Sequence, residues 1–146
     1  MINDRPTHLR VNLDAVLNNY RKLDKLNGLK TSLAVVKADS YGLGSKVIAD
    51  YLYKNGVRHF AVATLEEALE LKKYIKESLL LVLGVTNPKN VKYAVENSIS
   101  LTCPSKEWFE ETLKELEKID GKLKLHIKLE TGMNRIGTSE VEEIME

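Results

Sequence analysis

The sequence predicts an α/β protein in which parallel strands alternate with helices. Apolar runs of strand length recur along the chain, and they begin near Leu33, Phe60, Leu79, Ile99 and Leu123. Between each pair of runs lies a stretch whose apolar residues follow the helical period. A repeated succession of strand and helix favours parallel pairing through right-handed crossovers.

Helix-start signals precede the predicted helices and support this alternation. Each signal places a short polar side chain where it can accept a hydrogen bond from the first turn. The signals are Ser45 before a helix over 46–54, Thr64 with Glu67 in capping-box spacing before a helix to about Lys76, Asn87 before Pro88, and Ser105 after Pro104.

The first 30 residues differ from this pattern. Leu9, Val11 and Leu13 alternate with polar neighbours, which predicts a half-exposed strand, and Asp14 is expected to cap an amphipathic helix. We therefore predict a leading strand and helix over 1–30, followed by the strand–helix units over 31–146.

At the other end, Ser139 has capping-box spacing to Glu142, yet the sequence stops at Glu146 without a C-cap. An interrupted helix and a frayed tail both fit this ending.

Composition narrows the class of partner. The 146 residues include 22 basic and 21 acidic ones, so a net charge of +1 predicts no general attraction to nucleic acid or to an anionic membrane. The longest apolar run, from Leu79 to Leu83, is too short to span a bilayer. The single cysteine, Cys103, fits a reducing cytoplasm. A small molecule is the expected partner.

Lys37 is the first candidate for chemistry. It follows the apolar run that begins at Leu33, and ligands of parallel α/β folds meet the carboxyl ends of the strands. A lysine there can bind a carbonyl cofactor covalently, or simply end the strand by reaching into water. Tyr41 adds a hydroxyl to the same loop, and Gly42 and Gly44 allow the backbone to approach a ligand.

The segment from Leu123 to Gly137 is the second candidate. Its residues alternate, so that Lys124, His126, Lys128 and Glu130 share one strand face. This face is a solvated surface or, if the sheet curls into a barrel, part of the lumen. His126 is expected to be structural, and no metal site is predicted. Arg135 in the following loop can supply a fixed cation to a phenolate or carboxylate.

Read together, these two segments resemble alanine racemase, a family that uses pyridoxal 5'-phosphate to interconvert L- and D-alanine. Its V-K-A-[ND]-A-Y-G-H-G motif stands here as residues 36–44, with Ser40 for the commoner alanine and Leu43 for the usual histidine. Its K-x-[DE]-T-G-M-x-R-x-G motif stands as residues 128–137. The opening 11–20 is also similar, so the resemblance covers essentially the whole chain.

The resemblance implies a role for each matching residue. Lys37 would hold the cofactor as an aldimine and transfer the α proton on one face of the substrate. Tyr41 would bind the cofactor phosphate. Arg135 would contact the phenolic oxygen of the cofactor and the substrate carboxylate. Lys128 is carbamylated in many members, and a carbamate there would pair with Arg135.

The resemblance also implies a longer protein. A complete (β/α)8 barrel needs roughly 250 residues, so this chain would hold about five of its eight strands. The family adds a C-terminal β domain, whose tyrosine acts from the partner subunit as the second base. We expect an N-terminal fragment that is weakly active or inactive alone, from a cytoplasmic homodimer that makes D-alanine for peptidoglycan.

Several alternatives stay open. The sheet could be an open doubly wound sheet instead of a partial barrel. The chain could be a noncatalytic carrier of pyridoxal phosphate, or a structural half-barrel that binds no cofactor. Within the racemases, serine or several amino acids could be the substrate.

Overall fold

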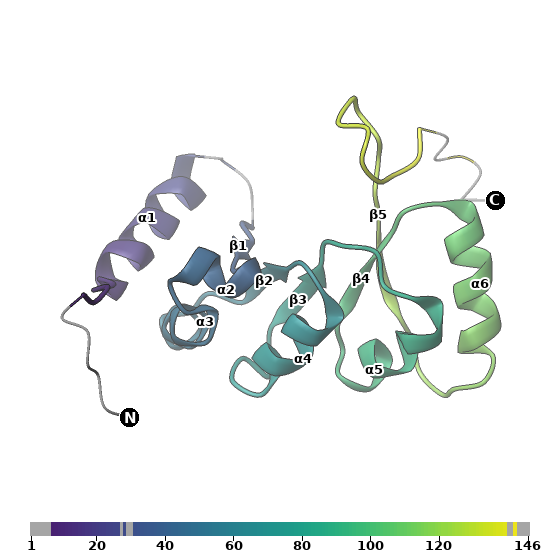
Figure 1. The fold of residues 1–146 in the computed structure, drawn as a ribbon, viewed down its shortest axis with the longest axis horizontal. Helices are drawn as coiled ribbons and strands as arrows, with labels where there is room; N and C mark the ends of the chain where they lie inside the picture. Colours follow the sequence, from purple (N-terminus) through teal and green to yellow (C-terminus); the bar gives the residue numbers. More distant parts are fainter. Residues whose placement is uncertain (1–6, 27, 29–30, 140–141, 143–146) are drawn as a thin grey trace.

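The computed structural model describes residues 7–26, 28, 31–139 and 142, and it contains one parallel sheet. Figure 1 shows its strands side by side in chain order. They are β1 (Ala34–Val35), β2 (His59–Val62), β3 (Leu79–Val82), β4 (Ser100–Cys103) and β5 (Lys124–Ile127). A doubly wound sheet reverses its strand order at a switch point, whereas a barrel wall does not. The described strands therefore form a barrel-type wall, and the doubly wound alternative is wrong.

Strand register separates the sheet into an apolar and a polar face. Phe60 pairs with Leu80 and Leu101 with Leu125, and all four side chains join the core between the sheet and its helices. On the other face, Ala61 pairs with Leu81, and Thr102 pairs with His126. This face becomes more hydrophilic from β2 toward β5.

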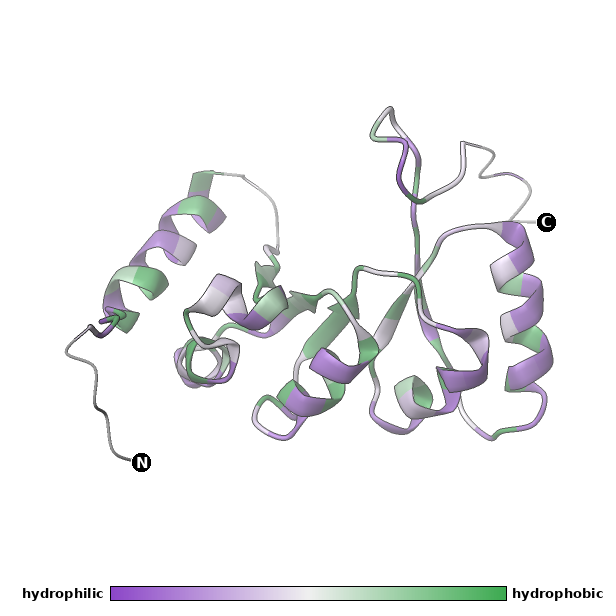
Figure 2. Ribbon diagram, viewed as in Figure 1, coloured by the Kyte–Doolittle hydropathy of each residue, from purple (hydrophilic) through white to green (hydrophobic). Residues whose placement is uncertain are grey.

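The helices after the strands cover the apolar face, as the predicted alternation requires. Ile48, Ala68, Ala94 and Trp108 are buried there, one from each of four helices. The helices carry hydrophobic and hydrophilic residues on different sides (Figure 2). They are α3 (Ser45–Lys54), α4 (Leu65–Lys72), α5 (Val91–Glu96, preceded by the 3-10 turn η1, Pro88–Asn90) and α6 (Lys106–Leu116).

Three of the predicted caps are confirmed. Thr64 and Ser105 each accept a hydrogen bond from the third residue of the helix that follows, both at 3.3 Å. Asn87 accepts from the backbone N–H of Lys89 at 3.0 Å.

Two features of these helices differ from the prediction. Ser45 is the first residue of α3 and caps nothing; its backbone N–H donates to Asp39 Oδ1 at 2.7 Å. Helix α4 ends at Lys72, four residues before the expected end, and the Lys72 amine then donates to the carbonyl oxygens of Lys76 and Ser78.

The strand expected over Leu9 to Leu13 does not form. Residues 7–12 have no strand beside them in the described part of the chain, and a strand without a neighbour leaves its ladder hydrogen bonds unmade. Helix α1 (Leu13–Leu26) begins instead, and Asn12, not Asp14, caps it by accepting from the Ala15 N–H at 3.0 Å. Asp14 accepts a hydrogen bond from the Tyr51 hydroxyl on α3.

The ends of the chain are partly outside the described residues. The helix predicted from Ser139 falls mostly there, so it stays a prediction, as does the division between residues 30 and 31. The buried Leu17 of α1 belongs to the same apolar core as the sheet. None of the helices in the described ranges is long and apolar enough to cross a membrane.

Candidate functional site

Two adjoining hollows of about 240 and 300 Å³ open at the carboxyl ends of the strands. Both are lined by Lys37, Arg135 and Ile136, which come from the two segments that the sequence analysis singled out. Lys128, Thr102 and His126 line the larger one. Ligands of parallel β/α proteins bind at this end of the sheet, so these hollows form the candidate site.

Lys37 is held at the site by the end of β1. The preceding Val36 is buried, and its backbone N–H donates to the carbonyl oxygen of Ala61 at 2.9 Å. The Lys37 side chain is half-buried. Within the described residues its amine has no hydrogen-bond or ion-pair partner, and the same is true of the Arg135 guanidinium. Both cations are therefore available to a ligand.

A left-handed turn follows Lys37, within the segment α2 (Lys37–Gly42). Ala38, Asp39, Ser40 and Tyr41 all have φ between 50° and 55°. This conformation costs a residue with a side chain roughly 1–2 kcal/mol, so four in succession need compensating contacts. Asp39 supplies one of them, because its carboxylate accepts from the N–H of Ser45 and so joins the turn to α3.

The loop after β5 is closed by a short backbone ladder. The backbone N–H of Glu130 donates to the carbonyl oxygen of Thr138, and the backbone N–H of Thr138 donates to the carbonyl oxygen of Lys128, both at 2.9 Å. A Cβ atom at Gly137 would lie 2.8 Å from the Lys128 carbonyl oxygen, and φ there is +118°, so the position requires glycine.

The Glu130 carboxylate folds the tip of this loop. It accepts hydrogen bonds from the backbone N–H groups of Gly132 at 2.5 Å and Arg135 at 3.4 Å. Backbone hydrogen bonds from Asn134 and then Gly132 lower the pKa of Glu130 below its usual range. Glu130 thereby fixes the main chain at Arg135.

The structure brings together three of the four predicted site residues. Lys37, Lys128 and Arg135 line the same hollow, and the Lys128 amine donates to the carbonyl oxygen of Leu129 at 3.3 Å. Tyr41 lies outside both hollows, with its side chain 76% exposed. The left-handed turn separates it from Lys37.

Thr102 and Gly84 are among the lining residues that were not identified from the sequence. Thr102 lines the larger hollow, and its hydroxyl donates to the Val82 carbonyl oxygen at 2.7 Å. Gly84 lines the smaller one, where a Cβ atom would lie 2.5 Å from the carbonyl oxygen of Ala63. A glycine directly after the apolar run of β3 is a signal for such a close approach, whereas a threonine within a strand carries no comparable signal.

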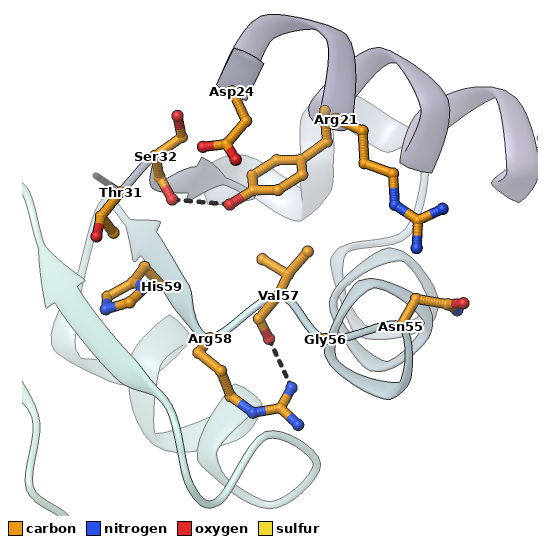
Figure 3. Close-up of a pocket in the computed structure, with 10 residues that line it drawn as sticks. Arg21, Asp24, Thr31, Ser32, Asn55, Gly56, Val57, Arg58 and His59 are labelled. Atoms are coloured by element: carbon orange, nitrogen blue, oxygen red, sulfur yellow. Dashed lines mark hydrogen bonds between the residues drawn. The ribbon is translucent and has the colours of Figure 1, made fainter. Parts of the chain in front are cut away.

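A further hollow, of about 350 Å³, lies at the opposite ends of β1 and β2 (Figure 3). Three of its polar side chains, those of Tyr20, Asn55 and Arg58, donate hydrogen bonds to main-chain carbonyl oxygens. The Tyr20 hydroxyl donates to the Ser32 carbonyl oxygen at 2.9 Å, and burial, followed by the charge of Asp24, raises the pKa of Tyr20. Arg58 donates to the carbonyl oxygens of Val57 and Tyr53. The Tyr20 hydrogen bond joins α1 to the segment that leads into β1.

Metal ligation has no support in the described ranges. They contain no group of three or more histidine, cysteine, aspartate or glutamate side chains placed to hold a metal ion.

The fold and the site together define a class of protein, in which the wall of a β/α barrel carries cationic side chains at the carboxyl ends of its strands. A family model described as alanine racemase, N-terminal domain, matches residues 11–146. The chain belongs to this family.

Individual relatives agree with the family match. An alanine racemase of Staphylococcus epidermidis is 46% identical over 143 residues, which are 97% of this chain and 37% of that protein. The chain thus spans little more than a third of this relative's length.

Solved structures show the same relationship. The alanine racemase from Bartonella henselae with covalently bound pyridoxal phosphate superposes with a TM-score of 0.82 at 30% identity, over 92% of this chain and 40% of that one. A histidine racemase from Leuconostoc mesenteroides also gives a TM-score of 0.82, at 28% identity, over 91% of this chain and 38% of that one.

Proposed function

We propose that this chain supplies the lysine side of an alanine racemase active site, which uses pyridoxal 5'-phosphate to interconvert L- and D-alanine. The observation that carries the proposal is the convergence of Lys37 and Arg135, 98 positions apart in the sequence, on one hollow at the carboxyl ends of the strands. When bound, the cofactor withdraws electrons from the amino acid and makes its α hydrogen acidic.

The residues at the site fit this cofactor. Lys37 and Arg135 line one hollow, and its described lining contains no carboxylate. A phosphate, a phenolate and a substrate carboxylate are all anionic, so such a lining favours them. The unengaged amine of Lys37 is available for covalent attachment of an aldehyde.

Each side chain has a separate task in this proposal. Lys37 holds the cofactor and carries the α proton to and from one face of the substrate. Arg135 donates hydrogen bonds to the phenolic oxygen of the cofactor and to the substrate carboxylate, which its planar guanidinium does with better geometry than a lysine. Tyr41 binds the phosphate, and this requires its exposed side chain to turn toward the hollow.

Lys128 has a different task, because a third cation beside Lys37 and Arg135 adds repulsion. Its neutral amine adds to carbon dioxide and releases a proton to solvent, which gives a carbamate anion that pairs with Arg135. We include this modification in the proposal.

Racemisation also needs a proton carrier on the opposite face of the substrate. In this proposal it comes from the part of the protein that the chain does not cover. One positioned proton carrier contributes typically 10²- to 10⁴-fold to the rate, so we expect the isolated chain to be weakly active or inactive. In the whole protein we propose a cytoplasmic homodimer that supplies D-alanine for peptidoglycan.

Covalent labelling tests the proposal directly. The chain is incubated with pyridoxal 5'-phosphate, reduced with borohydride and mapped by peptide mass spectrometry. We expect saturable labelling of Lys37, none at this position in Lys37→Ala, and unchanged labelling in Lys46→Ala, which removes an exposed lysine of α3. Labelling scattered over many lysines would contradict a site preformed in this chain.

A racemase for another amino acid is the second candidate. The histidine racemase aligns with this chain as well as an alanine racemase does, so the aligned part of the fold serves more than one substrate. Rates of racemisation of alanine, serine and histidine by the whole protein discriminate between these substrates. A rate for alanine below that for either other amino acid would refute the alanine assignment.

A further inference from the structure

We infer that Glu67 is a positioning residue for Lys37, a role that rests on the proposed function. Glu67 does not line either hollow, so it acts through the main chain. Its carboxylate joins the loop after β1 to the loop after β2 and thereby fixes the direction in which Lys37 leaves the sheet.

The geometry uses both oxygens of the carboxylate. Oε1 accepts from the backbone N–H of Ala38, the residue directly after Lys37, at 2.8 Å. Oε2 accepts from the backbone N–H of Ala63, which lines the hollow with Lys37, also at 2.8 Å. Hydrogen bonds to an ionised acceptor are stronger than neutral ones, so one side chain holds two neighbouring loops together. We call these two hydrogen bonds, from Ala38 and Ala63 to the Glu67 carboxylate, the Glu67 clamp.

This arrangement departs from the capping box that the sequence predicts. In that motif Glu67 would reach back to the N–H of Thr64. Thr64 does accept from the Glu67 N–H, but the Glu67 carboxylate crosses to Ala38, 29 positions earlier in the chain. A contact needed only to start α4 would not require this crossing.

The Glu67 side chain projects from a helix that is packed into the core. Glu67 stands in the first turn of α4, between the buried side chains of Leu65 and Ala68. A carboxylate is also favoured at this end of a helix by the helix dipole. The other end of the clamp is the first residue of the left-handed turn, where Ala38 has φ 50°. Its N–H is therefore held where the unusual conformation begins.

The test compares Glu67→Gln with Glu66→Gln in the same chain. Both variants remove one negative charge from the first turn of α4, but Glu66 is exposed and its side chain has no hydrogen bond or ion pair within the described residues. An amide at position 67 accepts from one of the two N–H groups and presents its own N–H₂ to the other. The two variants therefore have the same net charge, but only Glu67→Gln alters the hydrogen bonds to Ala38 and Ala63.

Two measurements, neither of which requires catalytic activity, test whether these hydrogen bonds position Lys37. The first is the rate at which pyridoxal 5'-phosphate followed by borohydride labels Lys37. The second is the rate of hydrogen exchange at the Ala38 and Ala63 amides, with the amides of β3 as a check that the variant is folded. We expect Glu67→Gln to slow the labelling of Lys37 at least tenfold and to speed exchange at both amides at least tenfold, while Glu66→Gln leaves both rates unchanged.

The outcomes separate this inference from the proposed function. If the parent chain labels Lys37 and Glu67→Gln labels it equally fast, Glu67 does not position the lysine and the inference is wrong. If the parent shows no selective labelling of Lys37, the proposed function of this chain fails. Unchanged exchange at Ala38 in Glu67→Gln overturns the clamp in either case.

Discussion

Trp108 donates its indole N–H to the carbonyl oxygen of Thr86 at 2.6 Å, and both residues are buried. The bond ties α6 to the loop that follows β3. Val85, which lines the smaller hollow, is the neighbour of Thr86 in this loop. A contact of the helix layer therefore supports one wall of the candidate site.

The first prediction concerns this bond. Trp108→Phe keeps an aromatic ring but removes the donor, which leaves the Thr86 carbonyl oxygen without that partner. We expect the free energy of unfolding to fall by about 1–3 kcal/mol in urea titrations. Tyr93→Phe, an aromatic change on the exposed surface of α5, is the control and should stay within about 0.5 kcal/mol. Equal effects of the two would refute the prediction.

The second prediction concerns Ser40 in the left-handed turn. Its hydroxyl oxygen is buried and has no hydrogen-bond partner among the described residues. Ser40→Ala removes this group and should raise the free energy of unfolding by about 1 kcal/mol. Ser105→Ala, which removes the cap of α6, should lower it by about 0.5–2 kcal/mol. A loss of stability in both variants would show that the Ser40 hydroxyl is satisfied in solution.

The third prediction compares two glycines of the loop after β5. Gly132 and Gly137 both have positive φ, but only at Gly137 does an added Cβ atom meet the backbone, 2.8 Å from the Lys128 carbonyl oxygen. Gly137→Ala should therefore destabilise the chain by about 1–3 kcal/mol more than Gly132→Ala, measured by urea unfolding. Equal losses would mean that φ alone governs both positions.

The fourth prediction concerns the pH dependence of the hydrogen bonds that Glu130 accepts. Glu130 has a lowered pKa in the folded chain, so its hydrogen bonds contribute stability above its ordinary value near 4.5, and this stability is lost as the pH falls through the folded pKa. The Gly132 amide resonance should titrate with a midpoint below 4.5. In Glu130→Gln the same resonance should not move in this range. A midpoint at or above the ordinary value would contradict the lowered pKa.

Much of the fold could be predicted because its signals are local. The apolar runs at Phe60 and Leu79 mark two strands, and the caps at Thr64 and Ser105 mark two helix starts. The strand expected at Leu9 was wrong because alternation describes one strand and says nothing of a neighbour to pair with.

The site was less predictable than the fold. Motif residues identified Lys37 and Arg135, and the parallel strands bring both to one end of the sheet. The left-handed turn could not be predicted from the residue types, because alanine, serine and tyrosine rarely adopt φ near 50°. The exposure of Tyr41 and the reach of Glu67 both depend on that turn, and both appear only in three dimensions.

The strand order described above also bears on how the chain reaches its fold. Each of β2, β3, β4 and β5 pairs with the strand made just before it, across a connection that contains one or two helical segments. Residues that pair across neighbouring strands lie 19 to 26 positions apart in the sequence, so each pairing closes one unit of similar length, and the entropy of closing such a loop rises only slowly with its length. Strand pairing can therefore be added one β/α unit at a time, from the N-terminal side, as the chain is made. Lys37 and its turn would then be placed early, whereas Arg135 joins them only after five strands have assembled.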